Sequence, residues 1–167
     1  MFLPENYKSP EGNYMKLQDG ENTFRVLSSA IVGWEYWNRD NKPVRSEKDF
    51  VQTPADIRME DGKPSSIKHF WAFLVYNHRA EKQQILEITQ SSIQNAIRAL
   101  VTNPKWGDPK GYDITITRSG SGFDTEYTVM PNPHTELEIK PINVNLNALY
   151  TGGDPFANEV TLEDIKL

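Results

Sequence analysis

The sequence predicts an all-β protein with one helix, in which five strands close into a small barrel. Short stretches rich in β-branched and aromatic residues recur along the chain, and eleven prolines and ten glycines separate them. A single segment, beginning at Ser91, has apolar residues at helical spacing. With 167 residues, the chain is long enough for one domain with a substantial core.

The first predicted strand covers residues 22–37 and changes its pattern part-way. In a strand, apolar residues usually occupy every second position. Here that alternation between odd and even positions is broken between Leu27 and Ile31, which indicates a bend or bulge. Residues 38–66 are polar, contain several prolines and are too long for a tight hairpin. We therefore expect a long elaborated loop after the first strand.

Residues 68–78 form the strongest predicted strand. Both the odd-numbered and the even-numbered positions are apolar, so both faces of this strand should be covered. A polar turn leads to a third strand over residues 83–90. The helix then begins with a capping-box pattern, Ser91 and Gln94, and stops before Pro104. Its apolar face is predicted from Ile93, Ile97, Leu100 and Val101.

Two further strands alternate apolar and polar residues, at 112–117 and 126–129, around a Ser-Gly-Ser-Gly turn. A helix between the third and fourth of five strands is the arrangement of an OB-fold barrel, which commonly binds oligonucleotides. The same order is also compatible with an open sheet and one helix. We expect an extended N-terminal arm at 1–21, the OB-fold-like domain at 22–150 and a short acidic C-terminal tail at 151–167.

Several classes of function are disfavoured by the sequence. The chain has no cysteines, no phosphate-binding Gly-Lys-Ser/Thr loop, and no Gly-x-Ser-x-Gly nucleophile motif. Its three histidines, His69, His78 and His134, lack the spacing of a helical zinc site. We predict no enzyme activity, no catalytic residue, no cofactor and no metal. No apolar run reaches the ~18 residues of a membrane span. Residues 1–16 have no positively charged start followed by an apolar stretch, so we expect no secretion signal there.

Aromatic side chains next to basic ones are the candidate binding residues. Single-stranded nucleic acid needs flat rings on which bases stack and cations along the phosphate path. The net charge of −5 does not exclude this, because the basic residues are grouped locally and acids gather near the C-terminus. The alternative is that the rings form the core and the charges are ordinary solvated ones. The candidates are Trp34, Tyr36, Trp37, Arg39, Lys42, Arg45, Lys68, Trp71, Phe73 and Arg79.

Four stretches resemble the single-stranded-DNA-binding proteins of phage replication systems: GWEYWNRDNKPVRS, KHFWAFLVYNH, ILEITQSSIQNAI and NPKWGDPKGYDITITRSGSGFDTEYTVMPNP. The resemblance covers residues 22–133. It implies an OB-fold core that coats displaced single strands during replication and recombination, in the cytoplasm of an infected bacterial host. It also implies an acidic C-terminal tail that recruits replication proteins and competes with DNA.

Carried over to this chain, the resemblance assigns ring positions to Trp34, Trp37, Trp71 and Phe73, and cationic positions to Arg39, Lys42, Arg45, Lys68 and Arg79. Two features depart from the family. Some members hold zinc through Cys and His, and this chain has no cysteine, so we expect no metal. The tail is short and contains Lys166, which puts its recruitment role in doubt.

Two other classes of function stay open at this point. A phage structural or assembly protein with a β-barrel would use the same aromatic residues to bind a protein partner. An enzyme, or an accessory subunit such as a nuclease component, would need a cluster of acids to hold a metal. No such cluster can be assembled from the sequence.

Overall fold

The computed structural model of the chain describes residues 2–5 and 12–157. Its central element is β6 (Lys68–Asn77), which pairs with three other strands. One edge of β6 pairs with β7 (Lys82–Ile88). The other edge pairs first with β2 (Ile31–Trp37) and then with β1 (Gly20–Val26). Apolar residues of β6 pack on both sides of the sheet, so both faces of this strand take part in cores, as the sequence predicted.

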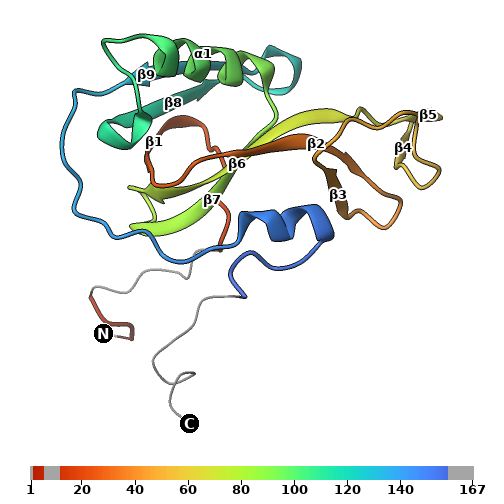
Figure 1. The fold of residues 1–167 in the computed structure, drawn as a ribbon, viewed down its shortest axis with the longest axis horizontal. Coiled ribbons are helices and arrows are strands. Elements are labelled where there is room, and N and C mark those ends of the chain that lie inside the picture. Colours follow the sequence, from red (N-terminus) through yellow and green to blue (C-terminus); the bar gives the residue numbers. More distant parts are fainter. Residues whose placement is uncertain (1, 6–11, 158–167) are drawn as a thin grey trace.

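The first predicted strand is divided into β1 and β2 by a break at residues 27–30. Backbone groups of Leu74 in β6 hold this break in place. The Leu27 amide donates to the Leu74 carbonyl at 2.8 Å, and the Leu74 amide donates to the Ser28 hydroxyl at 2.8 Å. The expected bend is therefore confirmed, and it turns β2 away from β1 while both remain paired to β6 (Figure 1).

The remaining strands extend the sheet in both directions. β8 (Asp113–Ser119) pairs with β1, and β9 (Glu126–Pro131) pairs with β8. β3 (Pro43–Ser46) pairs with β2 at the opposite end. All these pairs are antiparallel, and they give one seven-stranded sheet.

The long loop predicted after the first strand holds secondary structure of its own. Besides β3, it contains a separate hairpin of β4 (Met59–Glu60) and β5 (Lys63–Pro64). This hairpin lies at the far end of the molecule from β9 (Figure 1). The loop is thus an extension of the fold beyond the five predicted strands.

The sheet is not closed into a barrel, and this corrects the five-stranded barrel predicted from the sequence. Within the described residues, β9 pairs only with β8. The outer edge of β7 is occupied by residues 13–15, because the Met15 amide donates to the Ile85 carbonyl and the Ile85 amide to the Asn13 carbonyl, both at 2.9 Å. Part of the predicted N-terminal arm therefore takes the edge with which a closing strand would pair.

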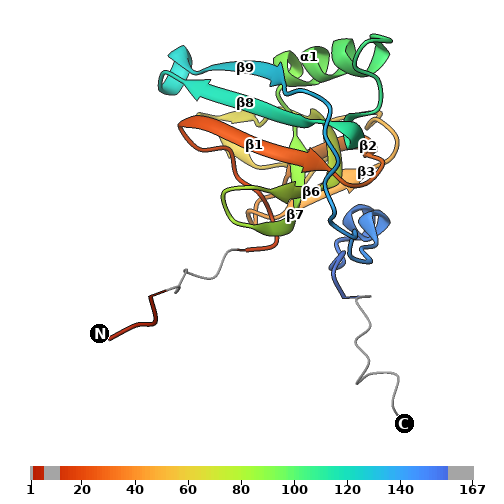
Figure 2. The same cartoon turned by 90° about the vertical axis from the view of Figure 1, so that its left-hand side faces the viewer.

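The helix α1 (Ser91–Thr102) lies across one side of the sheet, beside β9 (Figures 1 and 2). The predicted capping box is wrong. The N-cap is Gln90, without a side-chain cap, and the Gln94 side-chain Nε2 donates instead to the carbonyls of Ile88 and His69 at 2.9 and 3.1 Å. These two hydrogen bonds join the helix to β6 and β7, and the Gln94 side chain is buried against these strands.

Two apolar cores lie on opposite sides of β6. The larger lies under α1 and contains Ile93, Ile97 and Phe73. The smaller lies under the 3₁₀ helix η3 (Leu146–Thr151), where Leu146 and Leu149 cover Phe70. Figures 1 and 2 place α1 and η3 on opposite sides of the sheet. The C-terminal part of the described chain therefore covers one face, and α1 covers only part of the other.

Gly33 is required where β2 passes between β3 and β6. A Cβ atom there would lie 2.3 Å from the Ser46 carbonyl oxygen and 3.0 Å from the Phe70 ring. We expect Gly33→Ala to lower the free energy of unfolding by about 2 kcal/mol, since backbone of β3 must move to admit the methyl group. Urea denaturation measures this. Gly12→Ala, where a Cβ meets nothing within 4 Å, is the control, and equal stability of the two variants would contradict the prediction.

Candidate nucleic-acid interface

Aromatic side chains of β2 and β6 share one face of the sheet, on the side of α1. The register pairs Val32 with Trp71 and Trp34 with His69. Residues directly opposite each other in an antiparallel pair project to the same face. These four residues form what we call the open face. The rings of Trp34 and His69 are 4.7 Å apart at an angle of 49°.

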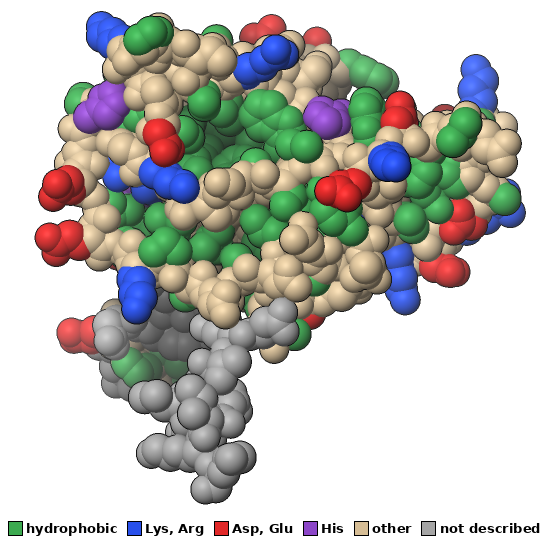
Figure 3. Space-filling model, in the orientation of Figure 1, with side chains coloured by type: hydrophobic (Ala, Val, Ile, Leu, Met, Phe, Trp, Pro, Cys, Tyr) green, Lys and Arg blue, Asp and Glu red, His purple; other side chains and the backbone are tan. Residues whose placement is uncertain are grey.

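The open face is accessible where α1 no longer covers the sheet. Val32 is 47% exposed, and both Trp34 and Trp71 are partly exposed. Figure 3 shows hydrophobic side chains gathered below α1, over the middle of the sheet, where the surface is hollowed. Partly exposed apolar surface of this kind is characteristic of binding sites.

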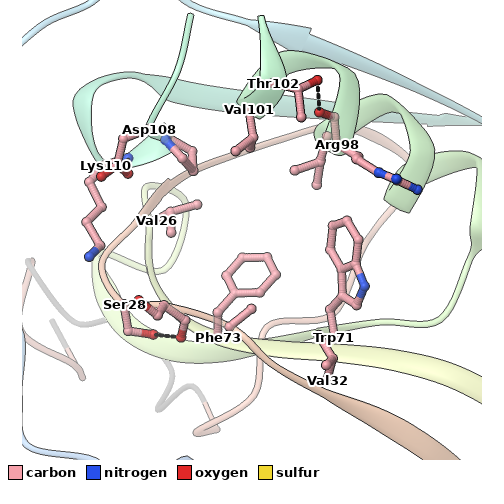
Figure 4. Close-up of a pocket in the computed structure, with 14 residues that line it drawn as sticks. Val26, Ser28, Val32, Trp71, Phe73, Arg98, Val101, Thr102, Asp108 and Lys110 are labelled. Carbon is pink, nitrogen blue, oxygen red and sulfur yellow. Dashed lines mark hydrogen bonds between the residues drawn. The ribbon is translucent and has the colours of Figure 1, made fainter.

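The hollow is a pocket of about 620 Å³ at the α1 end of the open face. Such a volume is within the range of small-molecule sites, about 300–1,000 Å³. The break at residues 27–30 forms one wall, α1 forms another, and residues 108–110 close the end. Trp71 and Phe73 point into it from β6, and Val101 faces them from the helix (Figure 4). The bend in the first strand and the end of the helix together create this space.

Two basic residues border the pocket. Arg98 on α1 lies next to the Trp71 indole, and Lys110 lies at the opposite end (Figure 4). Both are exposed, and neither side chain pairs with any residue of the described part of the chain. Asp108 is the acid of the lining, and its carboxylate accepts a hydrogen bond from the Lys110 amide at 2.9 Å. The border is therefore positively charged on balance.

Sequence reasoning missed Arg98 and Lys110 as site residues. Arg98 lies between Ile97 and the exposed Val101, at the margin of the apolar face of α1. A basic residue at that margin is a signal that could have been noted. Lys110 lies in a short 3₁₀ turn, Pro109–Gly111, and only the tertiary structure brings this turn to the pocket.

Among the predicted ring positions, the structure brings Trp34, Trp71 and Phe73 onto the same face. Phe73 is 4% exposed and contributes to the core as well as to the pocket. Tyr36 shares this face by strand alternation but is 6% exposed. Its hydroxyl donates to Asp56 at 2.8 Å, and burial, with that hydrogen bond and the Asp56 charge, raises the pKa of Tyr36 to about 12.

The other predicted residues do not meet at the open face. Trp37 lies on the opposite face of β2, 38% exposed, with the Arg58 guanidinium 5.8 Å from its ring centre. Lys68 pairs in register with Glu35, so it projects to that opposite face too. Arg39 and Lys42 are exposed at the β2–β3 turn, as their places in the sequence and the register show. Arg79 is also exposed and donates to the Glu21 carbonyl at 2.6 Å.

Arg45 belongs to a buried ionic cluster on the opposite face. Its Nε donates to Glu35 at 3.2 Å, and its Nη2 donates to Glu87 at 2.6 Å. Burial, followed by a hydrogen bond with Glu87 and its charge, raises the pKa of Glu35 to about 8, although Arg45 opposes this. Arg45 therefore makes an ion pair with Glu87 and a hydrogen bond with Glu35, and these contacts join β3 to β7 and β2.

The described residues hold neither a metal-binding cluster nor a membrane-spanning helix. Across residues 2–5 and 12–157, no group of three or more His, Cys, Asp or Glu side chains is placed to hold a metal ion. No helix within these ranges has the length and apolar character needed to cross a membrane.

Comparisons with known proteins complete the description of the site. No protein-family model matches the chain, and no solved structure matches it. The chain is similar to a "Probable ssDNA-binding protein" of Escherichia phage T5. The two are 24% identical over 152 residues, covering 76% of this chain. The chain spans a little over half of the length of the phage T5 protein, 58%. The name of the phage T5 protein describes binding to single-stranded DNA and no catalytic activity.

Proposed function

We propose that the chain binds single-stranded DNA on its open face, without reading its sequence. Bases stack on Trp34 and Trp71, and the phosphates follow Arg98 and Lys110. The observation that carries this proposal is that partly exposed rings share a face bordered by two cations whose side chains pair with no described residue. Flat rings accept any base and cations accept the backbone, so this combination suits a single strand.

The open face is a better candidate than the opposite face for two reasons. Leu146, Leu149 and Tyr150 cover the opposite face beside β6. Its most central predicted cation, Arg45, is already paired with two acids. A DNA strand on that face would have to displace the chain's own residues and break a buried ionic cluster, which is unfavourable.

We also infer an OB-related arrangement and a role in phage replication and recombination. The OB-related arrangement is supported by the single helix between β7 and β8, and by the pairing of β1 with both β6 and β8. The role is supported by the sequence resemblance and by the phage origin of the similar protein. In this proposal the protein coats single strands in the cytoplasm of an infected bacterium. Recruitment of replication proteins falls to the acidic tail, whose residues 158–167 lie outside the described part of the chain.

Titration with oligo-dT at several salt concentrations tests the proposed function. Binding is expected to quench tryptophan fluorescence and to weaken as salt rises, because bound phosphates release counterions. Arg98→Gln and Lys110→Gln should each reduce the slope of log K against log salt by about 0.7, the value for one phosphate of a single strand. Lys63→Gln, on the distant β5, is the matched control and should leave the slope unchanged.

The result that ends this proposal is an absence of oligo-dT binding at low salt. A stable complex with a protein partner, formed without nucleic acid, would then favour a phage structural or assembly role. The same fluorescence assay with duplex DNA and with RNA measures the preference for single-stranded DNA.

A further inference from the structure

We infer that one nucleobase of the bound strand leaves the stacked row and inserts into the pocket between α1 and β6. This inference rests on the proposed function and adds a defined subsite to it. The Trp71 indole belongs to both places: it is part of the open face and it also forms a wall of the pocket. A DNA strand whose base stacks on Trp71 is therefore already at the pocket entrance.

The lining of the pocket suits the flat, largely apolar faces of a base. Side chains from three elements surround it: Val26 from β1, Phe73 from β6, and Ile97 and Val101 from α1. Phe73 and Trp71 bring their rings into the space from one side (Figure 4). Rings and aliphatic groups make favourable contacts with the π-face of any base.

The charges at the entrance suit the phosphates on either side of an inserted base. Arg98 and Lys110 stand at opposite ends of the pocket, and no described residue pairs with either side chain (Figure 4). A nucleotide whose base points inward carries its phosphates at the rim, where these cations lie. An uncharged apolar side chain of a protein partner would fill the same pocket without using them, so the cations favour a nucleotide as the occupant.

The pocket offers few groups that could read the edge of a base. The Ser28 hydroxyl donates to the Ser29 carbonyl at 2.9 Å and accepts from the Leu74 amide. The Thr102 hydroxyl donates to the Arg98 carbonyl at 2.8 Å. Ser29 is an exposed residue of the lining, and the Asp108 carboxylate already accepts from the Lys110 amide. Because most of these polar groups are engaged, insertion depends mainly on shape and stacking. The subsite therefore recognises a base without a strong preference among the four.

The test combines a filled pocket with an incomplete DNA strand. Val101→Trp fills the pocket from an exposed helix position, and Val51→Trp adds the same side chain at an exposed site outside the lining. The ligand is oligo-dT of the shortest length that binds fully, with one abasic site placed at each position in turn. We expect Val101→Trp to weaken binding of intact oligo-dT by roughly tenfold, the loss for one unstacked base, and Val51→Trp to have little effect.

The abasic series gives a readout that does not depend on the stability of a variant. In the wild-type protein, one position of the strand should be about tenfold more sensitive to base removal than its neighbours. In Val101→Trp this extra sensitivity should disappear. Equal sensitivity at all positions, or unchanged affinity of Val101→Trp for intact oligo-dT, overturns the inference while the proposed function stands. A wild-type protein that does not bind oligo-dT overturns both.

Discussion

Replacing Trp71 with leucine is expected to weaken oligo-dT binding by about 5- to 150-fold, because one base–ring stack contributes about 1–3 kcal/mol. Leucine keeps an apolar side chain at a position that also packs against the core under α1. Loss of stability should therefore be small compared with the loss of affinity. Trp34→Leu should act in the same direction, since Trp34 lies further along the same face.

Trp37→Leu is the matched control for this prediction. It removes an indole from β2, the strand that carries Trp34, but from the opposite face of the sheet. Fluorescence anisotropy of a labelled oligo-dT measures all three variants, and thermal unfolding shows that each remains folded. If Trp37→Leu loses more affinity than Trp71→Leu, the interface lies on the other face and the open-face proposal is wrong.

The second large effect concerns stability and pH, through Glu35. Its carboxyl has a pKa of about 8 in the folded protein, against 4.5 for an unperturbed glutamate, because it is buried beside Glu87. Between these two pH values the folded state holds a proton that the unfolded state has lost. The free energy of unfolding should therefore fall as pH rises through this window, at a rate on the order of 1 kcal/mol per pH unit.

Glu35→Gln is expected to remove this pH dependence. The amide is neutral at every pH, it can accept from Arg45, and it leaves one acid, Glu87, paired with one base. At pH 8 the variant should be more stable than the wild type by ~2 kcal/mol. Urea denaturation at pH 5, 6.5 and 8 measures both proteins, with the exposed Glu136→Gln as control. A wild-type stability that rises over this range would refute the assignment.

Much of the local structure could be predicted from the sequence. The strand β6, the break between β1 and β2, and the helix beginning at Ser91 follow from patterns spanning a few residues. The prediction was wrong at the helix N-cap, since Gln94 donates to carbonyls of β6 and β7 instead of capping. Its partners are at least six residues away in the chain, and a local pattern carries no information about them.

The candidate site was predicted only in part, for a similar reason. Strand alternation separates Trp34 from Trp37, and it places Trp71 and Phe73 on one face of β6. Arg45 was selected as a free cation, yet the fold pairs it with Glu87, a residue of β7. Arg98 was not selected, yet the fold places it beside the Trp71 ring. Which charges are paired depends on contacts between distant segments.

The sequence by itself determined the class of the fold, a mainly β chain with one helix, and the rings from which a binding surface can be built. These properties follow from the periodicity and composition of short segments. Only the tertiary structure decided that the sheet stays open, that one face is covered by residues 144–156, and that a pocket forms beside Trp71. The physical reason is competition for strand edges and apolar faces: residues 13–15 occupy the free edge of β7, and the C-terminal segment buries the side of the sheet opposite α1.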